Sequence, residues 1–176
     1  MVQIHTIHSC PPASYTRAIG EVAAEWGAFE FAVEKLIWVL LKIGPKEGRL
    51  VTTQMNIRPK LEILKGLIGR SGMDATLSKN LLVVVKRALT LSDARNRIIH
   101  GLWSTPQKIG GKPKKPRKMF LYWYRGSTAT RIMPVTERIS PQQIRAIASE
   151  IRGLHVFISI ATRELLPQPE ASPSKA

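Results

Sequence analysis

Cysteine, acidic side chains and long apolar runs are all scarce in this chain of 176 residues. The single cysteine, Cys10, excludes a disulfide within the chain and is typical of a reducing compartment, so we expect a cytoplasmic protein. The only aspartates are Asp74 and Asp93, and no run of carboxylates suggests a two-metal centre. We therefore expect no metal and no cofactor.

Long apolar stretches are missing as well. The nearest candidate, residues 31–43, contains Glu34, Lys35 and Lys42, whereas a membrane span needs roughly 18 uncharged apolar residues. Residues 1–12 lack the basic start and apolar stretch of a signal peptide. We expect no signal peptide and no membrane insertion.

Positive charge is abundant. The chain has 27 Lys and Arg residues against 12 Asp and Glu, which gives a formal net charge of +15. Such a charge attracts polyanions and speeds their encounter, so nucleic acid or an anionic membrane is the expected partner. A basic surface without a specific ligand is the alternative.

Apolar residues recur at alternating spacings of three and four, as on the buried face of a helix. The pattern predicts helices over residues 15–42, 49–55, 59–68, 74–102 and 141–165.

Local signals mark the ends of these helices. Gly44 and Pro45 end the first one, and Asp74 can cap the helix that follows it. Ser140 and Gln143 form the pattern of a capping box at the start of the last helix.

A segment of different composition lies before the last helix. Residues 110–118, Gly-Gly-Lys-Pro-Lys-Lys-Pro-Arg-Lys, predict a mobile basic loop. The aromatic-rich residues 119–125 and residues 129–135 predict an antiparallel hairpin, with residues 103–108 as a third strand. The insertion therefore covers about residues 103–136.

We predict an all-α fold, a four- to five-helix bundle with a small antiparallel β-hairpin inserted before the last helix. It forms a single domain over residues 14–166. A flexible N-terminus over residues 1–13 precedes it, and a disordered tail over residues 167–176 follows it.

The helix predicted over residues 74–102 has one polar interruption in its apolar seam, Arg95. Asn96 and His100 lie one turn apart on a neighbouring stripe, with Ser92 on the same side. The helix therefore offers a guanidinium, an amide and an imidazole to one region.

An arginine buried without a partner costs several kcal/mol, so Arg95 must pair with a carboxylate, reach water or face an anion. Glu30 and Glu34 on the first helix are the obvious carboxylate partners. An ordinary core ion pair, with His100 only capping the helix end, is the structural alternative.

The same residues suit RNA cleavage without a metal. Histidine can move protons near neutral pH, and arginine can neutralise the charge that develops on phosphate. The candidate catalytic residues are accordingly Arg95, His100 and Asn96, the last of which can orient the imidazole or a phosphate oxygen. Each chain supplies one such histidine.

Residues 95–100, Arg-Asn-Arg-Ile-Ile-His, resemble the Arg-x4-6-His signature of the HEPN superfamily, including the polar residue after the arginine. The order of elements is also similar, with a long first helix that carries Trp26 and Glu30, the motif near the end of a later helix, and a closing helix. The resemblance covers roughly Tyr15 to Leu165. We assign supporting positions to Glu30, Ser92 and Trp103.

The resemblance implies a HEPN-like bundle that forms a homodimer, in which the motif helices of two subunits face each other. Arg95 and His100 of both subunits would then form one ribonuclease site that leaves a 2′,3′-cyclic phosphate and a 5′-hydroxyl. Such proteins include toxins, which have a cognate antitoxin as partner, and defence effectors.

The leading hypothesis is a dimeric, metal-independent endoribonuclease that cleaves single-stranded RNA. The alternatives are a catalytically inactive HEPN-like module that binds RNA, a nucleotide or a protein, and a structural dimer that associates with membrane or nucleic acid through its charge. A second RNA-binding element is predicted in the basic loop, whose alternative is a solvated charged loop. Its candidate residues are Lys112, Lys114, Lys115, Arg117 and Lys118.

Overall fold

The computed structural model describes residues 5–8, 11–106, 119–125 and 133–166. Within these ranges the chain forms five helices and four strands, and most of the described residues are helical. The prediction of a mainly helical chain with a small antiparallel sheet is confirmed. No helix in these ranges is long and apolar enough to cross a membrane.

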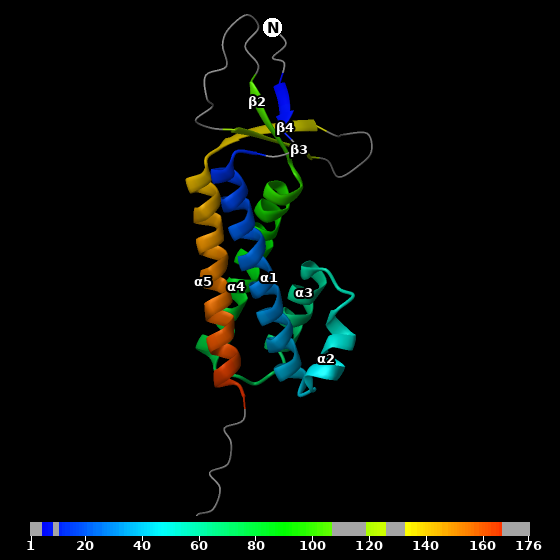
Figure 1. Ribbon diagram of the computed structural model, residues 1–176. Helices are drawn as coiled ribbons and strands as arrows, with labels where there is room; N and C mark the ends of the chain where they lie inside the picture. Colours follow the sequence, from blue (N-terminus) through cyan, green and yellow to red (C-terminus); the bar gives the residue numbers. More distant parts are fainter. Residues whose placement is uncertain (1–4, 9–10, 107–118, 126–132, 167–176) are drawn as a thin grey trace, which may run out of the picture.

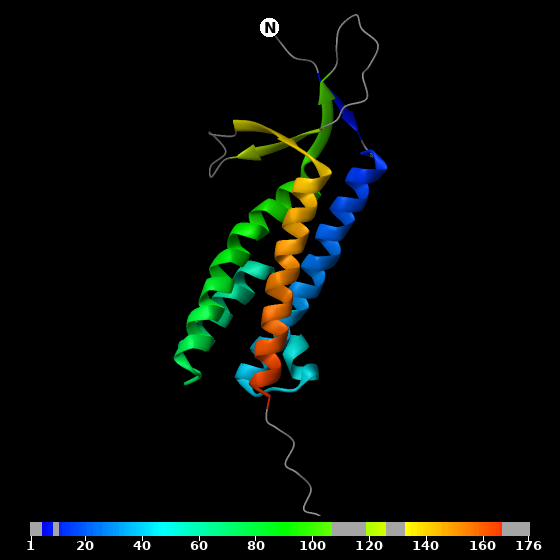
Figure 2. The same cartoon turned by 90° about the vertical axis from the view of Figure 1, so that its left-hand side faces the viewer.

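Three long helices lie side by side: α1 (Ala13–Leu41), α4 (Ala75–His100) and α5 (Pro141–Glu164) (Figure 1, Figure 2). The most extensive contact is between α1 and α5. Apolar residues at spacings of three and four face the core, as the sequence predicts. Those of α1 that are fully buried are Ala18, Val22, Phe29, Val33, Leu36 and Ile37.

Two shorter helices, α2 (Pro45–Thr52) and α3 (Ile57–Ile68), pack against α1, and α3 also contacts α4 (Figure 1). Both helices begin before the predicted residues 49 and 59. Pro45 is the first residue of α2, a position where its missing N–H costs no helical hydrogen bond. The proline that ends the pattern of α1 therefore also starts the next helix.

The four strands form one antiparallel sheet in the order β1-β2-β3-β4. It lies at one end of the helices, where α1 and α5 begin and α4 ends (Figure 1, Figure 2). The strands are β1 (His5–His8), β2 (Leu102–Pro106), β3 (Met119–Arg125) and β4 (Met133–Ile139).

The sheet is larger than the predicted hairpin. The expectation of a flexible N-terminus over residues 1–13 is wrong for His5–His8, which pair with β2. A strand of four residues is too short for alternation of apolar and polar residues to reveal it. Leu102, predicted on a helical seam, instead opens β2, because α4 ends at His100.

The fourth strand is shifted along the chain relative to the prediction. It begins at Met133 rather than at residue 129, so Pro134 lies near its start, opposite Tyr124. Because β4 is at the edge of the sheet, a proline there can be placed without interrupting a ladder on both sides.

Tyr15 joins α1 to the sheet. Its hydroxyl donates a hydrogen bond to the carbonyl of Ile139 (3.0 Å) and accepts one from the amide of Met119 (2.8 Å). Its ring meets the ring of Trp103 edge-on, with 5.7 Å between the centroids. Burial raises the pKa of the Tyr15 phenol, against the smaller lowering effect of the Met119 hydrogen bond. A single buried side chain thus links α1 with β2, β3 and the end of β4.

Replacing Tyr15 by Phe leaves the buried amide of Met119 and the carbonyl of Ile139 without their partner. We expect Tyr15→Phe to lower the free energy of unfolding by about 1–3 kcal/mol, measured by urea denaturation at neutral pH. Thr16→Val, which removes an exposed hydroxyl on the next residue, is the control and should cost less. Equal stability of Tyr15→Phe and the unaltered protein would contradict the anchoring role.

Candidate functional site

The candidate site lies in the last turns of α4, next to the sheet (Figure 1). Nη1 of Arg95 donates to Oδ1 of Asn96 (3.0 Å) and lies 3.3 Å from Nε2 of His100. Asn96 and His100 are exposed, whereas Arg95 is half-buried. The helix therefore brings the three predicted catalytic side chains into direct contact at the surface.

The contact fixes which histidine nitrogen accepts. A guanidinium only donates hydrogen bonds, so Nε2 of His100 is the acceptor, and the proton of the neutral ring is on Nδ1. In this arrangement His100 presents its basic nitrogen beside a permanent positive charge. The geometry suits a group that accepts a proton close to a bound anion.

Arg95 also has a donor with no partner. Its Nε is buried and makes no hydrogen bond among the described residues, and no carboxylate there forms an ion pair with its guanidinium. The Arg95 guanidinium instead contacts an amide and an imidazole. Such a cation is unusual on the apolar face of a helix, because buried charges are normally paired.

The carboxylates predicted to pair with Arg95 are used by another cation. Nζ of Lys60, on α3, donates to Oε1 of Glu30 (2.8 Å) and to Oε1 of Glu34 (2.5 Å), both on α1. The Lys60 side chain is only 4% exposed, so its ammonium depends on these two partners. The structural alternative, an ordinary core ion pair of Arg95 with Glu30 or Glu34, is therefore not what the structure shows.

Electrostatics at Lys60 follow from this arrangement. Burial by itself lowers the pKa of Lys60, but the hydrogen bonds and charges of Glu30 and Glu34 outweigh it and raise the pKa above its usual value. The ammonium form is thus the stable one, and α1 and α3 are held together by it. Lys60 is the residue that sequence reasoning missed here.

A signal for Lys60 was present in the sequence. Along α3 it belongs to the buried series Ile57, Lys60, Leu61, Leu64 and Ile68, so it is a charged residue on an apolar seam, as Arg95 is on α4. The spacing of Glu30 and Glu34, four residues apart on one helix face, is the matching signal on α1.

The supporting residues have different surroundings. Ser92 is buried in α4, one turn before Asn96. Trp103 is buried in β2 against Tyr15, so it belongs to the core between the sheet and α1. Glu30 belongs to the Lys60 ion pairs. The predicted RNA-binding residues Lys112, Lys114, Lys115, Arg117 and Lys118 lie outside the described residues.

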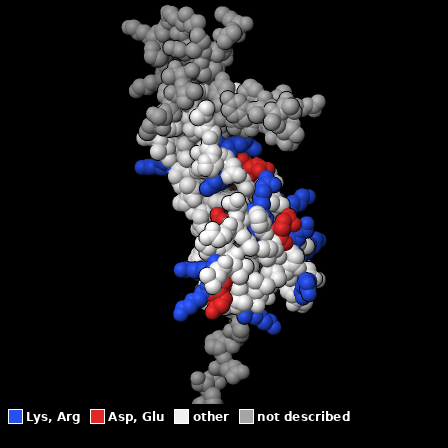
Figure 3. Space-filling model, turned by 90° about the vertical axis from the view of Figure 1, so that its right-hand side faces the viewer, with Lys and Arg blue, Asp and Glu red and all other residues white. Residues whose placement is uncertain are grey.

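Charged side chains elsewhere are spread rather than concentrated. Figure 3 shows lysine and arginine side chains along the described part of one face, with acidic side chains beside them at several places. Two exposed ion pairs flank the middle of α4: Arg58 of α3 with Asp93 (2.6 Å), and Arg87 with Glu150 of α5. Within the described ranges, no three His, Cys, Asp or Glu side chains are placed to hold a metal ion.

Comparison with known proteins gives no relatives. No protein-family model, no curated protein and no solved structure matches this chain.

The Lys60 ion pairs should contribute substantially to stability. Lys60→Met leaves two partly buried carboxylates without their cation, so we expect the free energy of unfolding to fall by about 3 kcal/mol in urea denaturation. Lys65→Met is the matched control. Lys65 is on the same helix and exposed, and its Nζ lies 3.9 Å from Oε2 of Glu62. Equal losses in the two variants would show that the buried pairs have no special weight.

Stability should also decline at high pH. The pKa values of Tyr15 and Lys60 are both raised in the folded chain, so their contributions are complete below about pH 10 and are lost as the pH rises above it. We expect the free energy of unfolding to decrease as the pH rises past 10, and to do so less steeply in Tyr15→Phe and Lys60→Met. If the free energy of unfolding fell equally steeply with pH in all three proteins, Tyr15 and Lys60 would not be the groups responsible.

Proposed function

We propose that this chain is a HEPN-like, dimeric endoribonuclease that cleaves single-stranded RNA without a metal, using Arg95, Asn96 and His100. The observation that carries the proposal is the state of Arg95. Its Nη1 lies 3.3 Å from Nε2 of His100, its buried Nε has no partner among the described residues, and Glu30 and Glu34 pair with Lys60 instead of with it.

The proposed reaction is a transesterification within the RNA. The 2′-oxygen of a ribose attacks the adjacent phosphorus, forming the P–O2′ bond, and the P–O5′ bond breaks. A base takes the proton of the 2′-hydroxyl, and an acid gives a proton to the departing 5′-oxygen. The products are a 2′,3′-cyclic phosphate and a 5′-hydroxyl, and no oxidant or reductant is needed.

The residues fit these tasks. Nε2 of His100 can accept the 2′-hydroxyl proton once a phosphate oxygen has taken the Arg95 donor from it, because the nitrogen has a single lone pair. The Arg95 guanidinium can donate to the non-bridging phosphate oxygens, whose negative charge grows in the transition state. Asn96, which accepts from Arg95, keeps the guanidinium oriented.

The homodimer supplies the second proton-transfer group. Among the described side chains a single histidine, His100, lies at this site, and it cannot serve at the same moment as base and as acid. A second copy that faces α4 would bring its own histidine and arginine to the same phosphate. The exposure of Asn96 and His100 at the end of α4 is compatible with such a contact.

In the cell, this activity would suit a toxin held in check by an antitoxin, or a defence effector, acting in the cytoplasm. A catalytically inactive module that binds RNA, a nucleotide or a protein partner is the second candidate. The exposed amide and imidazole beside a cation are compatible with binding alone. RNA cleavage separates the two candidates.

The test is incubation of the purified protein with labelled single-stranded RNA in EDTA. We expect cleavage to products with 2′,3′-cyclic phosphate ends, and we expect His100→Ala to reduce its rate by about 10²–10⁴-fold, the usual contribution of a general acid or base. Arg95→Met should reduce the rate comparably through loss of charge stabilisation.

His155→Ala is the matched control, because His155 lies on α5 and is half-buried. Size-exclusion chromatography with light scattering should show that all variants keep the same oligomeric state. Binding of RNA without cleavage by the unaltered protein would favour the inactive module. Absence of both would overturn the proposed function.

A further inference from the structure

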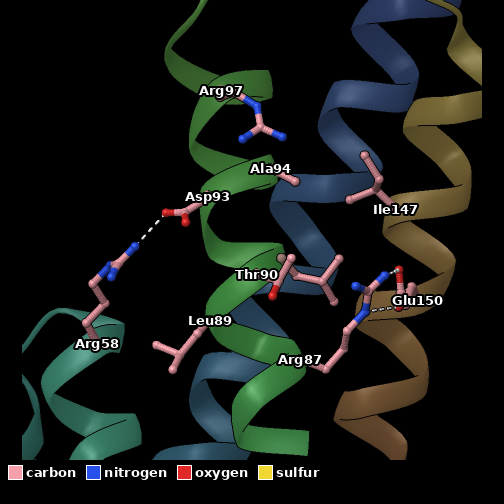
Figure 4. A pocket seen from close by; sticks show the side chains of 10 residues that line it. Arg58, Arg87, Leu89, Thr90, Asp93, Ala94, Arg97, Ile147 and Glu150 are labelled. Atoms are coloured by element: carbon pink, nitrogen blue, oxygen red, sulfur yellow. Dashed lines mark hydrogen bonds and ion pairs between the residues drawn. The ribbon is translucent and has the colours of Figure 1, made fainter. Parts of the chain in front are cut away.

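A recess of about 380 Å³ lies over the outward face of α4, between α3 and α5. Three arginines border it: Arg58 from α3 on one side, Arg87 facing α5 on the other, and Arg97 above them (Figure 4). Asp93 and Glu150 also line it. The charged residues of this α4 recess therefore number three cations and two anions, a formal excess of one positive charge.

The ion pairs hold two of these arginines in place without using all their donors. Nη2 of Arg58 contacts Oδ1 of Asp93 at 2.6 Å. Arg87 binds Glu150 through Nε and through Nη2, the latter at 2.8 Å to Oε2. A guanidinium has five N–H donors, so each arginine keeps donors beyond those that its carboxylate takes. Because the ion pairs already orient these guanidiniums, the arginine side chains lose less conformational freedom when an anion binds.

These pairs have little structural weight. The side chains of Arg58 and Asp93 are 58% and 55% exposed, and those of Arg87 and Glu150 are 47% and 38% exposed. Ion pairs at such exposure contribute little to stability, because water screens them.

The recess and the candidate catalytic residues are on the same helix, but none of Arg95, Asn96 and His100 lines the recess. Arg97 is two residues beyond Arg95 on the same helix and three before His100, so it lies within one turn of both along the helix axis. It points from another side of α4, since two residues correspond to about 200° of rotation. A strand bound at Arg95 must therefore pass around the side of α4 to enter the recess.

We propose that the α4 recess is a second phosphate subsite, which binds a phosphodiester of the single-stranded RNA at a distance along the strand from the cleaved bond. This inference rests on the proposed function. The ligand is a backbone phosphate, recognised by guanidinium N–H groups, and the subsite contributes affinity without reading base identity.

The test measures binding apart from cleavage. Full-length protein with His100→Ala binds a fluorescent single-stranded RNA in a series of KCl concentrations, followed by anisotropy. Adding Arg58→Gln and Arg97→Gln should weaken binding and reduce the slope of log affinity against log salt by about 0.7, the value for one phosphate contact on a single strand. Arg152→Gln is the control, because Arg152 is an exposed arginine paired with Glu25 away from the recess. It should leave the slope unchanged.

A second variant tests the opposite direction. Glu150→Gln removes a carboxylate from the recess and should tighten RNA binding and steepen the salt dependence. Circular dichroism confirms that each variant is folded. If the parent protein binds RNA but Arg58→Gln with Arg97→Gln and Glu150→Gln leave affinity and slope unchanged, the subsite is overturned while the proposed function stands. If the parent protein binds no RNA at any salt concentration, the proposed function itself fails.

Discussion

The structure depends on how two cations are accommodated on apolar helix faces. Lys60 on α3 and Arg95 on α4 each occupy a seam position, where a charge needs a partner. Lys60 takes both glutamates of α1 and ties α1 to α3. Arg95 is left with neutral contacts and one buried donor without a partner among the described residues. Because Lys60 pairs with both glutamates, neither of them neutralises Arg95, and its guanidinium can pair with an anion from outside the chain.

Local sequence patterns predict most of the fold. The long helices, the Asp74 cap and the capping box of Ser140 with Gln143 depend on neighbours a few residues apart, and the structure confirms them. The sheet was less predictable, because strand pairing joins distant segments. Nothing near His5–His8 indicates that β2 would be their partner, and the start of β4 is set by its register with β3. The start of α2 was predicted too late because Pro45 was interpreted only as the end of the first helix. A proline can also be the first residue of the next helix.

In the candidate site, too, local spacing predicts some contacts, whereas others depend on how distant elements pack. Asn96 and His100 share one face of α4 by their spacing of four, and the long side chain of Arg95 on the neighbouring stripe contacts both. The partner of Glu30 depends on how α3 docks against α1, which no local spacing determines. Trp103 follows the motif closely along the chain, but the turn into β2 carries it into the core beside Tyr15. A charged residue on an apolar seam was noted at Arg95 and overlooked at Lys60.

The most direct test of whether Arg95 binds phosphate is the nuclear magnetic resonance signal of its Nε–H. This signal can be assigned by its loss in Arg95→Lys. RNA with 2′-O-methyl groups cannot be cleaved, because the attacking hydroxyl is blocked, and it can be titrated into the labelled protein. The account predicts that the Arg95 signal shifts as the RNA binds, because the guanidinium gains a phosphate partner. A signal that stays in place while the RNA saturates the protein would contradict the claim that Arg95 is held ready for phosphate.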